Sequence, residues 1–156
     1  MIEICYRPIG VIHSPFREIA KVPGLPITAK GVEAQIELKA RFQEGLQDLE
    51  AFSHLILIYH FHLAEGKKLL IRSLWDDDEH GIFASRSTLR PNPIGISVVQ
   101  LVGVEENLIF IRDCDIADGT PLLDIKPYLT EYDAHATRSQ GWLKDFQKKA
   151  MKKKKN

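Results

Sequence analysis

The chain has 156 residues, enough for one domain with a buried core, and 44% of them are hydrophobic while 27% are charged. These fractions are typical of a globular protein and exclude a disordered or fibrous chain. The net charge of zero conceals an asymmetry, because six of the last nine residues are lysines. Without them, residues 1–147 hold 15 basic and 21 acidic side chains, a balance of −6, so the sequence predicts an acidic body with a basic tail.

The cysteines and the N-terminal residues indicate in which cellular compartment the protein is expected. Cys5 and Cys114 are too few for a disulfide framework, and their spacing matches no metal-binding motif, as is typical of reduced thiols in a cytosolic protein. The start of the chain, MIEICYRPIG, lacks the apolar core of a signal peptide. The most apolar run, LILIYHFHL, is far shorter than the roughly 20 residues that span a bilayer. We therefore expect a soluble, cytoplasmic protein with no membrane anchor.

Short strands dominate the predicted secondary structure. Extended runs are expected at residues 6–14, 32–38, 53–63, 68–75, 95–104 and 108–116. From Val32 to Leu38, apolar and polar residues alternate as in a strand with one buried face. Residues 105–107 separate the last two runs and predict a hairpin. Residues 14–31 contain three prolines and two glycines, which predicts a long loop, and long ordered loops are usually functional.

Helix is sparse in the prediction. Residues 40–52 are expected to form a turn or two, and residues 141–154 place Trp142, Phe146 and Ala150 on one face of a short amphipathic helix. About seven short strands with so little helix predict a mainly β fold, a small and mainly antiparallel barrel or curled sheet. The expected organisation is a barrel domain over residues 1–140, followed by the helix and the lysine-rich tail at residues 141–156.

A stiff corner lies within residues 85–101, SRSTLRPNPIGISVVQL. The two prolines of its Pro-Asn-Pro fix their own φ angles and hold the residues before them, Arg90 and Asn92, in extended conformations. Gly95 lacks a Cβ and therefore permits the close approach of another backbone or a ligand. A rigid corner can be purely structural, but the guanidinium groups of Arg86 and Arg90 suit a carboxylate or a phosphate.

An acidic segment follows at residues 113–128, DCDIADGTPLLDIKPY. Asp-Gly-Thr-Pro alone is a turn sequence, and an acidic loop is usually just solvated. The spacing of Asp113, Asp115 and Asp118 differs from that of a calcium loop, and no bidentate glutamate closes the set. We therefore expect no metal here.

Histidines are the remaining candidates for chemistry. His60 and His62 lie two apart on an apparent strand and hence on one face, but no third zinc ligand is obvious, which favours two partly buried histidines packed beside aromatic residues. The pairs at residues 13–14 and 53–54 lie at strand ends next to loops, where ligand contacts tend to be made. The sequence has no G-x-G-x-x-G, no Walker loop and no G-x-S-x-G elbow, which disfavours a Rossmann-type cofactor site.

Taken together, GVIHSPF, FSHLILIYHFH, GIFASRSTLRPNPIGISVVQL and DIADGTPLLDIKPY resemble the TsaA-like (YaeB or TrmO-type) family. The resemblance covers about residues 6–132, and the Arg-Pro-Asn-Pro-Ile-Gly and Asp-Gly-Thr-Pro motifs are specific to the family. It implies a single-sheeted β-barrel that binds S-adenosylmethionine outside any Rossmann fold, usually as a homodimer. It also implies methylation of the amino nitrogen of threonylcarbamoyl-adenosine beside the tRNA anticodon, the reaction of the characterised bacterial members.

The same resemblance implies which residues meet the cofactor. The implied contacts are Ser14, Pro15, Phe16, Ser53, His54, Arg86, Ile96, Asp115, Ile116, Asp118, Gly119 and Thr120. S-adenosylmethionine carries a carboxylate, for which Arg86 is the expected anion-binding fork, and a ribose, for which Asp118 is the expected partner. Ile96 and Phe16 are expected to form an apolar wall.

The acceptor side is expected to involve Asn92 and Tyr128 as catalytic residues. An adenine-type amino nitrogen is a poor nucleophile because its lone pair is delocalised into the ring. An enzyme can assist by accepting a hydrogen bond from the N–H and aligning the nitrogen with the methyl group. Asn92 is the candidate acceptor of that bond, and Tyr128 is expected to stack on the base or to take its proton.

The expected partner is tRNA, bound in part through Arg90 and Lys126, and the lysine tail is a candidate RNA handle. Longer bacterial relatives continue into a second domain thought to help hold tRNA, so the exact acceptor stays open. Two alternatives remain at this point. One is a sensor that binds S-adenosylmethionine or a nucleotide without turnover, and the other is a methyltransferase for an acceptor other than RNA.

Overall fold

The computed structural model describes residues 1–23, 26–73 and 78–144. Its strands are β1 (Gly10–His13), β2 (Glu33–Leu38), β3 (His54–His60), β4 (Leu70–Arg72), β5 (Glu79–Gly81), β6 (Ile94–Glu105), β7 (Leu108–Arg112) and β8 (Thr120–Pro127). The one α-helical turn in the described part of the chain is α1 (Thr130–Asp133). Short 3₁₀ segments are η1 (Ile19–Lys21), η2 (Pro26–Ala29), η3 (Ala40–Leu46), η4 (Leu49–Ala51), η5 (Ile82–Ala84) and η6 (Gly141–Leu143).

The chain divides into two compact units. The barrel unit comprises Met1–Glu65 and Asn92–Tyr128, and the second unit comprises Gly66–Pro91 and Leu129–Asn156. The stiff corner of the Pro-Asn-Pro motif is therefore also the point at which the chain passes from one unit to the other. This division concerns compactness, and the expected barrel domain over residues 1–140 with a tail at 141–156 stays a prediction.

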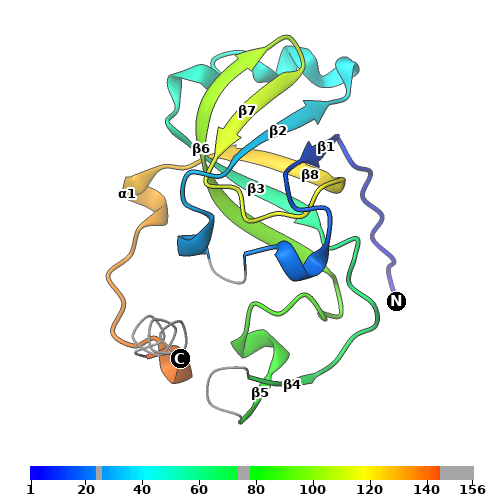
Figure 1. Cartoon of the computed structure of the whole chain (residues 1–156), viewed down its shortest axis with the longest axis vertical. Coiled ribbons are helices and arrows are strands. Elements are labelled where there is room, and N and C mark those ends of the chain that lie inside the picture. The colour runs from blue at the N-terminus through cyan, green and yellow to red at the C-terminus, as the bar shows by residue number, and fades with distance from the viewer. Residues whose placement is uncertain (24–25, 74–77, 145–156) are drawn as a thin grey trace. The chain divides into compact units, whose positions relative to one another are not determined.

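The barrel unit is a closed barrel of six antiparallel strands in the order β1-β2-β7-β6-β3-β8, with β8 paired back to β1 (Figure 1). Buried and more exposed residues alternate along its strands, so that one side chain in two points inward, as Leu55, Leu57 and Tyr59 do from β3. The long strand β6 pairs with β3 through its first half and with β7 through its second half. The predicted mainly β, antiparallel barrel is confirmed.

The predicted strand number is approximate, because the described residues contain eight strands, six in the barrel and two in a separate pair. Strand β8 escaped the sequence analysis since turn signals, Asp-Gly-Thr-Pro and Lys-Pro-Tyr, lie at its two ends and Asp124 interrupts its apolar run. Strand β5 has only three residues, too few to show a period.

The predicted connections are largely confirmed. Strands β6 and β7 form the expected hairpin, whose turn residue Glu106 has a φ of 55°. The long loop at residues 14–31 contains only η1 and η2 among its described residues. Residues 40–52 form the two 3₁₀ segments η3 and η4.

The structure describes only the first four residues of the helix that we predicted at residues 141–154. Residues 141–143 form a 3₁₀ turn, and the backbone of Lys144 leaves it with a ψ of 131°, so the described part of residues 141–154 is not the α-helix that we expected. Residues 145–156, which include Phe146, Ala150 and the lysine tail, lie outside the described residues. No helix in the described part of the chain is both long and apolar enough to cross a bilayer.

The two ends of the barrel are built differently. At one end, which we call the turn end, β1 finishes at His13, β3 finishes at His60 and β8 begins at Thr120. At the other end, the cap end, β3 begins and β8 finishes, and η3 and η4 lie beside the tip of the β6–β7 hairpin (Figure 1). Between the ends lies a continuous core that includes Ile12, Ile36, Leu57, Val99, Ile109 and Leu122, all fully buried.

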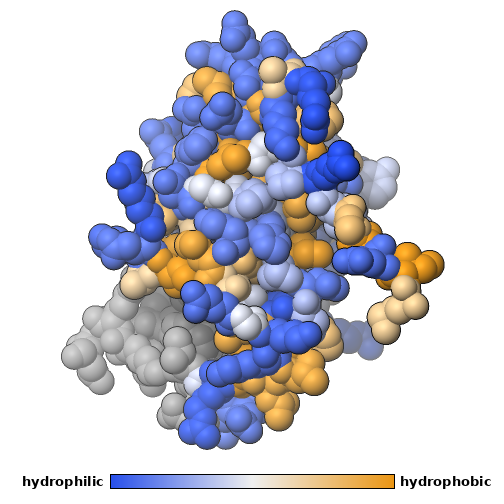
Figure 2. Space-filling model, turned by 90° about the vertical axis from the view of Figure 1, so that its right-hand side faces the viewer, coloured by the Kyte–Doolittle hydropathy of each residue, from blue (hydrophilic) through white to orange (hydrophobic). Residues whose placement is uncertain are grey.

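Not all apolar residues are inside. Figure 2 shows orange areas between the hydrophilic side chains of the face turned to the viewer. Exposed apolar side chains include Ile94, Ile96 and Val98 on the outer face of β6. The second unit has contacts of its own, since the Trp142 indole Nε1 donates to the carbonyl of Ala84 at 2.8 Å within that unit.

Candidate functional site

Two loops that are more than 100 residues apart in sequence are joined at the turn end. The Ser14 Oγ donates to the carbonyl of Ile116 at 2.7 Å, and the Ser14 N–H donates to the Asp118 carboxylate at 3.1 Å. In return, the Asp118 N–H donates to the carbonyl of Phe16 at 2.8 Å. The structure thus brings together two of the segments predicted to bind a cofactor, Ser14–Phe16 and Asp115–Thr120. We call this pair of loops the joined loops.

The conformation and hydrogen bonds of the Asp-Gly-Thr turn explain why glycine and threonine occupy positions 119 and 120. Gly119 has a φ of +75°, a conformation that other residues adopt only with strain, and its N–H donates to the carbonyl of Ile12 at 2.9 Å. The Thr120 hydroxyl is buried and donates to the carbonyl of Ala117 at 2.8 Å, which closes the turn. This turn is therefore a fixed feature and not a loosely solvated acidic loop.

A series of hydrogen bonds through buried hydroxyl groups connects the joined loops to the barrel interior. The Ser97 Oγ donates to the Asp115 carboxylate at 2.6 Å, and the Tyr59 hydroxyl lies 2.9 Å from the same Ser97 oxygen. Because serine has one hydroxyl proton, the tyrosine must be the donor to Ser97. Tyr59 and Ser97 are 5% and 8% exposed, so Asp115 is held by a chain anchored in the barrel interior.

The absence of a side chain at Gly95 leaves room for the Tyr59 ring, whose hydroxyl group begins this series of hydrogen bonds. A Cβ at Gly95 would lie 2.3 and 2.5 Å from two atoms of the Tyr59 ring and 2.9 Å from the Phe61 ring. The two rings meet edge to face with centroids 5.5 Å apart. The close approach that we expected at Gly95 therefore occurs, and aromatic side chains make it.

His62 is a residue whose place the sequence analysis misjudged. Strand β3 ends at His60, so His60 and His62 are not on one strand face as predicted. His62 lies in the following turn, where its Nδ1 is 3.3 Å from the Thr120 Oγ1. Burial lowers the pKa of His62 below its ordinary value of 6.5, the neighbouring His60 lowers it further, and the Asp118 carboxylate acts in the opposite direction.

A shallow cavity of about 500 Å³ adjoins the joined loops on the outer face of β1, β2 and β7. Its lining includes His13, Ser14, Arg17 and Asp118, together with the ring of Phe110. The His13 imidazole lies between two carboxylates, with Nε2 3.3 Å from Glu37 and Nδ1 3.8 Å from Asp118. The cavity thus combines hydrogen-bonding groups of both kinds with one aromatic wall.

Other predicted site residues lie at the cap end. The Tyr128 N–H donates to the carbonyl of His54 at 3.0 Å, and the two rings meet edge to face at 6.4 Å. Ser53 contacts His54 through a 2.9 Å hydrogen bond. The seven residues of β3 separate this group from the turn end by roughly 20 Å at 3.3 Å per residue. One barrel does not bring Ser53, His54 and Tyr128 next to the Asp-Gly-Thr turn.

The remaining predicted residues are scattered. Ile96 is on the outer face of β6 and 57% exposed, opposite Ile58 of β3, and Lys126 is paired with Asp124 at 2.8 Å near the cap end. Asn92 is exposed where β6 begins, and its carbonyl accepts a 2.7 Å hydrogen bond from the N–H of Ile94.

The two arginines of the corner belong to the second unit. Arg90 uses its guanidinium group within that unit, donating to the carbonyls of Ser85 at 2.8 Å and Ser87 at 3.4 Å. Arg86 is exposed and makes no hydrogen bond or ion pair with any other described residue. The anion-binding role of Arg86 and the tRNA contact of Arg90 therefore stay predictions, and the hydrogen bonds of Arg90 leave fewer of its donors for a phosphate. Within residues 1–23, 26–73 and 78–144, no group of three or more His, Cys, Asp or Glu side chains is arranged to hold a metal ion.

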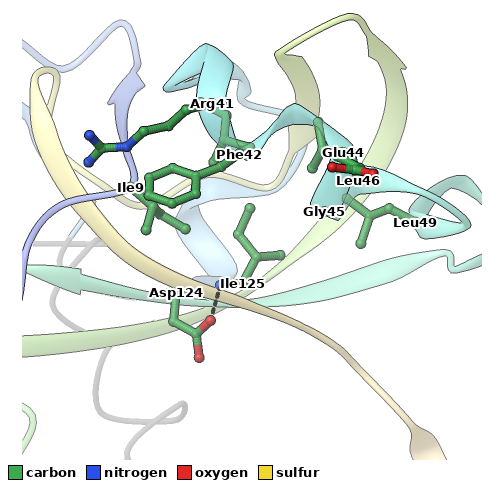
Figure 3. Close-up of a pocket in the computed structure, with 10 residues that line it drawn as sticks. Ile9, Arg41, Phe42, Glu44, Gly45, Leu46, Leu49, Asp124 and Ile125 are labelled. Carbon is green, nitrogen blue, oxygen red and sulfur yellow. Dashed lines mark hydrogen bonds between the residues drawn. The ribbon is translucent and has the colours of Figure 1, made fainter.

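A second cavity of about 470 Å³ lies at the cap end (Figure 3). Ile9, Phe42 and Ile125 point toward one another in Figure 3, and Leu46 and Leu49 add to this apolar part of the lining. Arg41, Glu44 and Asp124 line the cavity as well. The Asp124 carboxylate points away from the apolar part and accepts a hydrogen bond from the Ile125 N–H at 2.9 Å (Figure 3). None of the predicted site residues lines this cavity.

Comparison with known proteins identifies relatives over most of the chain. Residues 11–134 match the family described as tRNA-methyltransferase O N-terminal domain. A Pyrococcus abyssi protein described as a probable S-adenosyl-L-methionine-binding protein is 56% identical over 140 residues, which cover 90% of this chain and 76% of that protein. The tRNA (adenine(37)-N6)-methyltransferase of Escherichia coli is 39% identical over 134 residues, which cover 80% of this chain and 57% of the enzyme.

The fold comparison agrees. A crystal structure of TrmO superposes with a TM-score of 0.77 at 40% sequence identity, covering 90% of this chain and 64% of the solved one. The chain thus spans less than two thirds of the length of the E. coli enzyme and of that structure. The resemblance noted from the Arg-Pro-Asn-Pro-Ile-Gly and Asp-Gly-Thr-Pro motifs is confirmed. The chain belongs to the tRNA-methyltransferase O N-terminal domain family.

Proposed function

We propose that this protein is an S-adenosylmethionine-dependent methyltransferase that acts on tRNA, with the amino nitrogen of threonylcarbamoyl-adenosine next to the anticodon as the acceptor. The observation that carries the proposal is the pair of joined loops at the turn end. They unite Ser14–Phe16 with Asp115–Thr120 in a chain whose relatives include a tRNA (adenine(37)-N6)-methyltransferase. A fixed polar turn of this kind is what positioning of a small charged molecule requires.

The turn end fits S-adenosylmethionine in size and in chemistry. Its cavity of about 500 Å³ is within the usual range for small-molecule sites. Asp118 and His13 offer partners for ribose hydroxyl groups. The role of anion-binding fork stays a prediction for Arg86, which is exposed in the second unit. When bound, the cofactor supplies an electrophilic methyl group on a positively charged sulfur. The chain has to bind the cofactor and to align an acceptor with it.

The roles of the acceptor residues stay predictions, and of the two predicted for Tyr128, stacking on the base or taking its proton, we propose the first. Asn92, exposed beside the rigid corner, accepts a hydrogen bond from the acceptor N–H, and Tyr128 stacks on the base. Because Tyr128 and His54 lie roughly 20 Å from the turn end of their own barrel, we propose a homodimer in which the second copy supplies them. Light scattering is expected to report a dimer at micromolar concentration, and a monomer would contradict this arrangement.

The direct test of the reaction is product formation. The protein is incubated with S-adenosylmethionine and total tRNA, and S-adenosylhomocysteine is measured. The tRNA is then digested and analysed by mass spectrometry for threonylcarbamoyl-adenosine that is heavier by the mass of a single CH₂ group. Binding without S-adenosylhomocysteine would identify a sensor. Turnover that survives ribonuclease treatment of the acceptor pool would identify an acceptor other than RNA.

The cofactor assignment has its own test in Arg86. Replacing Arg86 with alanine removes a charged hydrogen-bonding partner, worth about 1.5–3 kcal/mol, so affinity for S-adenosylmethionine is expected to fall by about ten- to a hundredfold. Arg72→Ala, which removes another exposed arginine of the second unit, is the matched control and is expected to bind as the wild type does. Equal affinities for all three proteins in isothermal titration would contradict the role of Arg86.

The proposed partner raises a question of charge, since residues 1–147 have a balance of −6 and tRNA is a polyanion. We propose that the lysine tail contributes to tRNA binding in the cytoplasm, with Arg90 and Lys126 as further contacts. Replacing the six terminal lysines with glutamine is expected to weaken tRNA binding. It should also flatten the slope of log K against log salt by roughly 0.7–0.9 for each phosphate that the tail no longer neutralises. An unchanged slope would exclude the lysine tail as a contact for tRNA phosphates.

A further inference from the structure

The proposed reaction releases a proton. The amide oxygen of Asn92 is too weakly basic to take it, and Tyr128 is proposed above to stack on the base, so the acceptor of the proton is still to be assigned. When the nitrogen–carbon bond forms, the sulfur–carbon bond breaks and its electron pair stays on sulfur. The acceptor nitrogen then has to lose its hydrogen as a proton and keep the N–H electron pair. A base at the turn end, close to the proposed cofactor contacts, is therefore needed.

We propose that His62 is this base and accepts the proton at its Nε2 atom before releasing it to solvent. The inference rests on the proposed function and assigns a further catalytic residue to the same site. His62 adjoins the Asp-Gly-Thr turn directly, because its Nδ1 lies 3.3 Å from the Thr120 Oγ1 and its Nε2 lies 3.9 Å from where a Cβ at Gly119 would be. It is partly exposed, so a substrate can reach it.

The hydrogen bonds of Thr120 fix which imidazole nitrogen carries the proton. The Thr120 hydroxyl proton is directed at the carbonyl of Ala117, at 2.8 Å. The same oxygen can therefore only accept from His62, which places the imidazole proton on Nδ1 and leaves the lone pair on Nε2. This is the arrangement that a general base requires, with one ring nitrogen oriented by a hydrogen bond and the other free to react.

Glycine at position 119 leaves space beside that lone pair, since a Cβ there would lie 3.9 Å from the Nε2 of His62. Any larger residue there would put its side chain against the Nε2 of His62, in addition to the strain of a φ of +75°. The groups around the ring also favour its neutral form. Burial and His60 at the end of β3 lower the pKa of His62, and Asp118 of the turn only partly offsets them, so the balance favours the uncharged imidazole that a base requires.

The test uses His62→Asn, because the asparagine amide can still donate to Thr120 but has no basic lone pair. We expect kcat for tRNA methylation to fall by about 10²-fold or more, while the Kd for S-adenosylmethionine stays within about threefold of the wild type. The wild-type rate should fall as pH drops through the pKa of His62, and this acid limb should be lost in His62→Asn. His60→Gln is the matched control: it removes the neighbouring imidazole that lowers the pKa of His62, so its acid limb should move to higher pH while kcat at pH 8 is retained.

A second measurement needs neither turnover nor a variant. In ¹⁵N NMR spectra of the wild-type imidazoles, His62 is expected to be in the Nδ1–H tautomer and to titrate below its ordinary pKa of 6.5. The Nε2–H tautomer would overturn the proposal, as would a His62→Asn protein with wild-type kcat. A wild-type protein that forms no S-adenosylhomocysteine with tRNA would instead overturn the proposed function, and the base role with it.

Discussion

The two ends of the barrel hold cavities of similar size, about 500 and 470 Å³, but the side chains around them differ in kind. At the turn end, hydrogen bonds connect the loops to each other and, through Ser97, to the barrel interior. At the cap end, apolar side chains such as Phe42 and Leu49 cover the core (Figure 3). Hydrogen bonds fix direction, whereas apolar contacts mainly contribute burial, so the turn end is built to position a ligand and the cap end to close the barrel.

The largest effect is expected from a change that breaks the support of the turn end. Gly95→Ala would place a methyl group 2.3 Å from the Tyr59 ring, so the ring must move and the Tyr59–Ser97 hydrogen bond with it. Overpacking of this severity should lower the free energy of unfolding by about 3 kcal/mol, measured by urea denaturation.

Gly103→Ala is the matched control in the same strand, because a Cβ there would meet nothing within 4 Å. It should change the free energy of unfolding by less than about 1 kcal/mol. Similar decreases in the two variants would mean that the close approach at Gly95 is not what makes glycine necessary there.

A smaller effect, confined to one end, is expected from Ser97→Ala. It leaves the Asp115 carboxylate and the Tyr59 hydroxyl with one partner fewer, which should lower stability by about 2 kcal/mol and weaken S-adenosylmethionine binding. Phe42→Ala at the cap end removes a ring that is 37% exposed and should lower stability by about 1 kcal/mol without changing that affinity. Equal changes in affinity for the two variants, measured by isothermal titration, would remove the distinction between the ends.

The sequence allowed the barrel to be predicted better than the site. Residues 32–38 alternate strictly between apolar and polar residues, and strand β2 covers residues 33–38 of that run, because a half-buried strand imposes that pattern. Strand β8 has no such pattern, since it has a proline near each end and carries Asp124. Its presence follows from closure of the barrel, which is a property of all six strands together.

The same limit applies to the site. The link between Ser14 and Asp118 was anticipated only through family resemblance, because a contact between residues 104 positions apart leaves no local pattern. Spacing placed His60 and His62 together on a strand, since periodicity does not mark the residue at which a strand ends. The pairing of β8 with β3 places Tyr128 at the opposite end of the barrel from Thr120. That pairing likewise could not be predicted from the motif that contains both residues.

The smallest perturbation, and the finest probe of the difference between the ends, is the thiol of Cys114, which is fully buried beside Asp115 at the turn end. Burial raises its pKa to about 11, and because the thiolate is the reactive form, roughly one molecule in a thousand carries it at pH 8. Iodoacetamide should therefore label the exposed Cys5 rapidly and Cys114 only when the turn end opens. A ligand held by the joined loops opposes that opening, so S-adenosylmethionine at about 100 times its Kd should slow labelling of Cys114 by about a hundredfold and leave Cys5 unaffected. Mass spectrometry of the two cysteine peptides over time gives both rates, and protection of Cys5 alone, or of neither thiol, would place the cofactor away from the turn end.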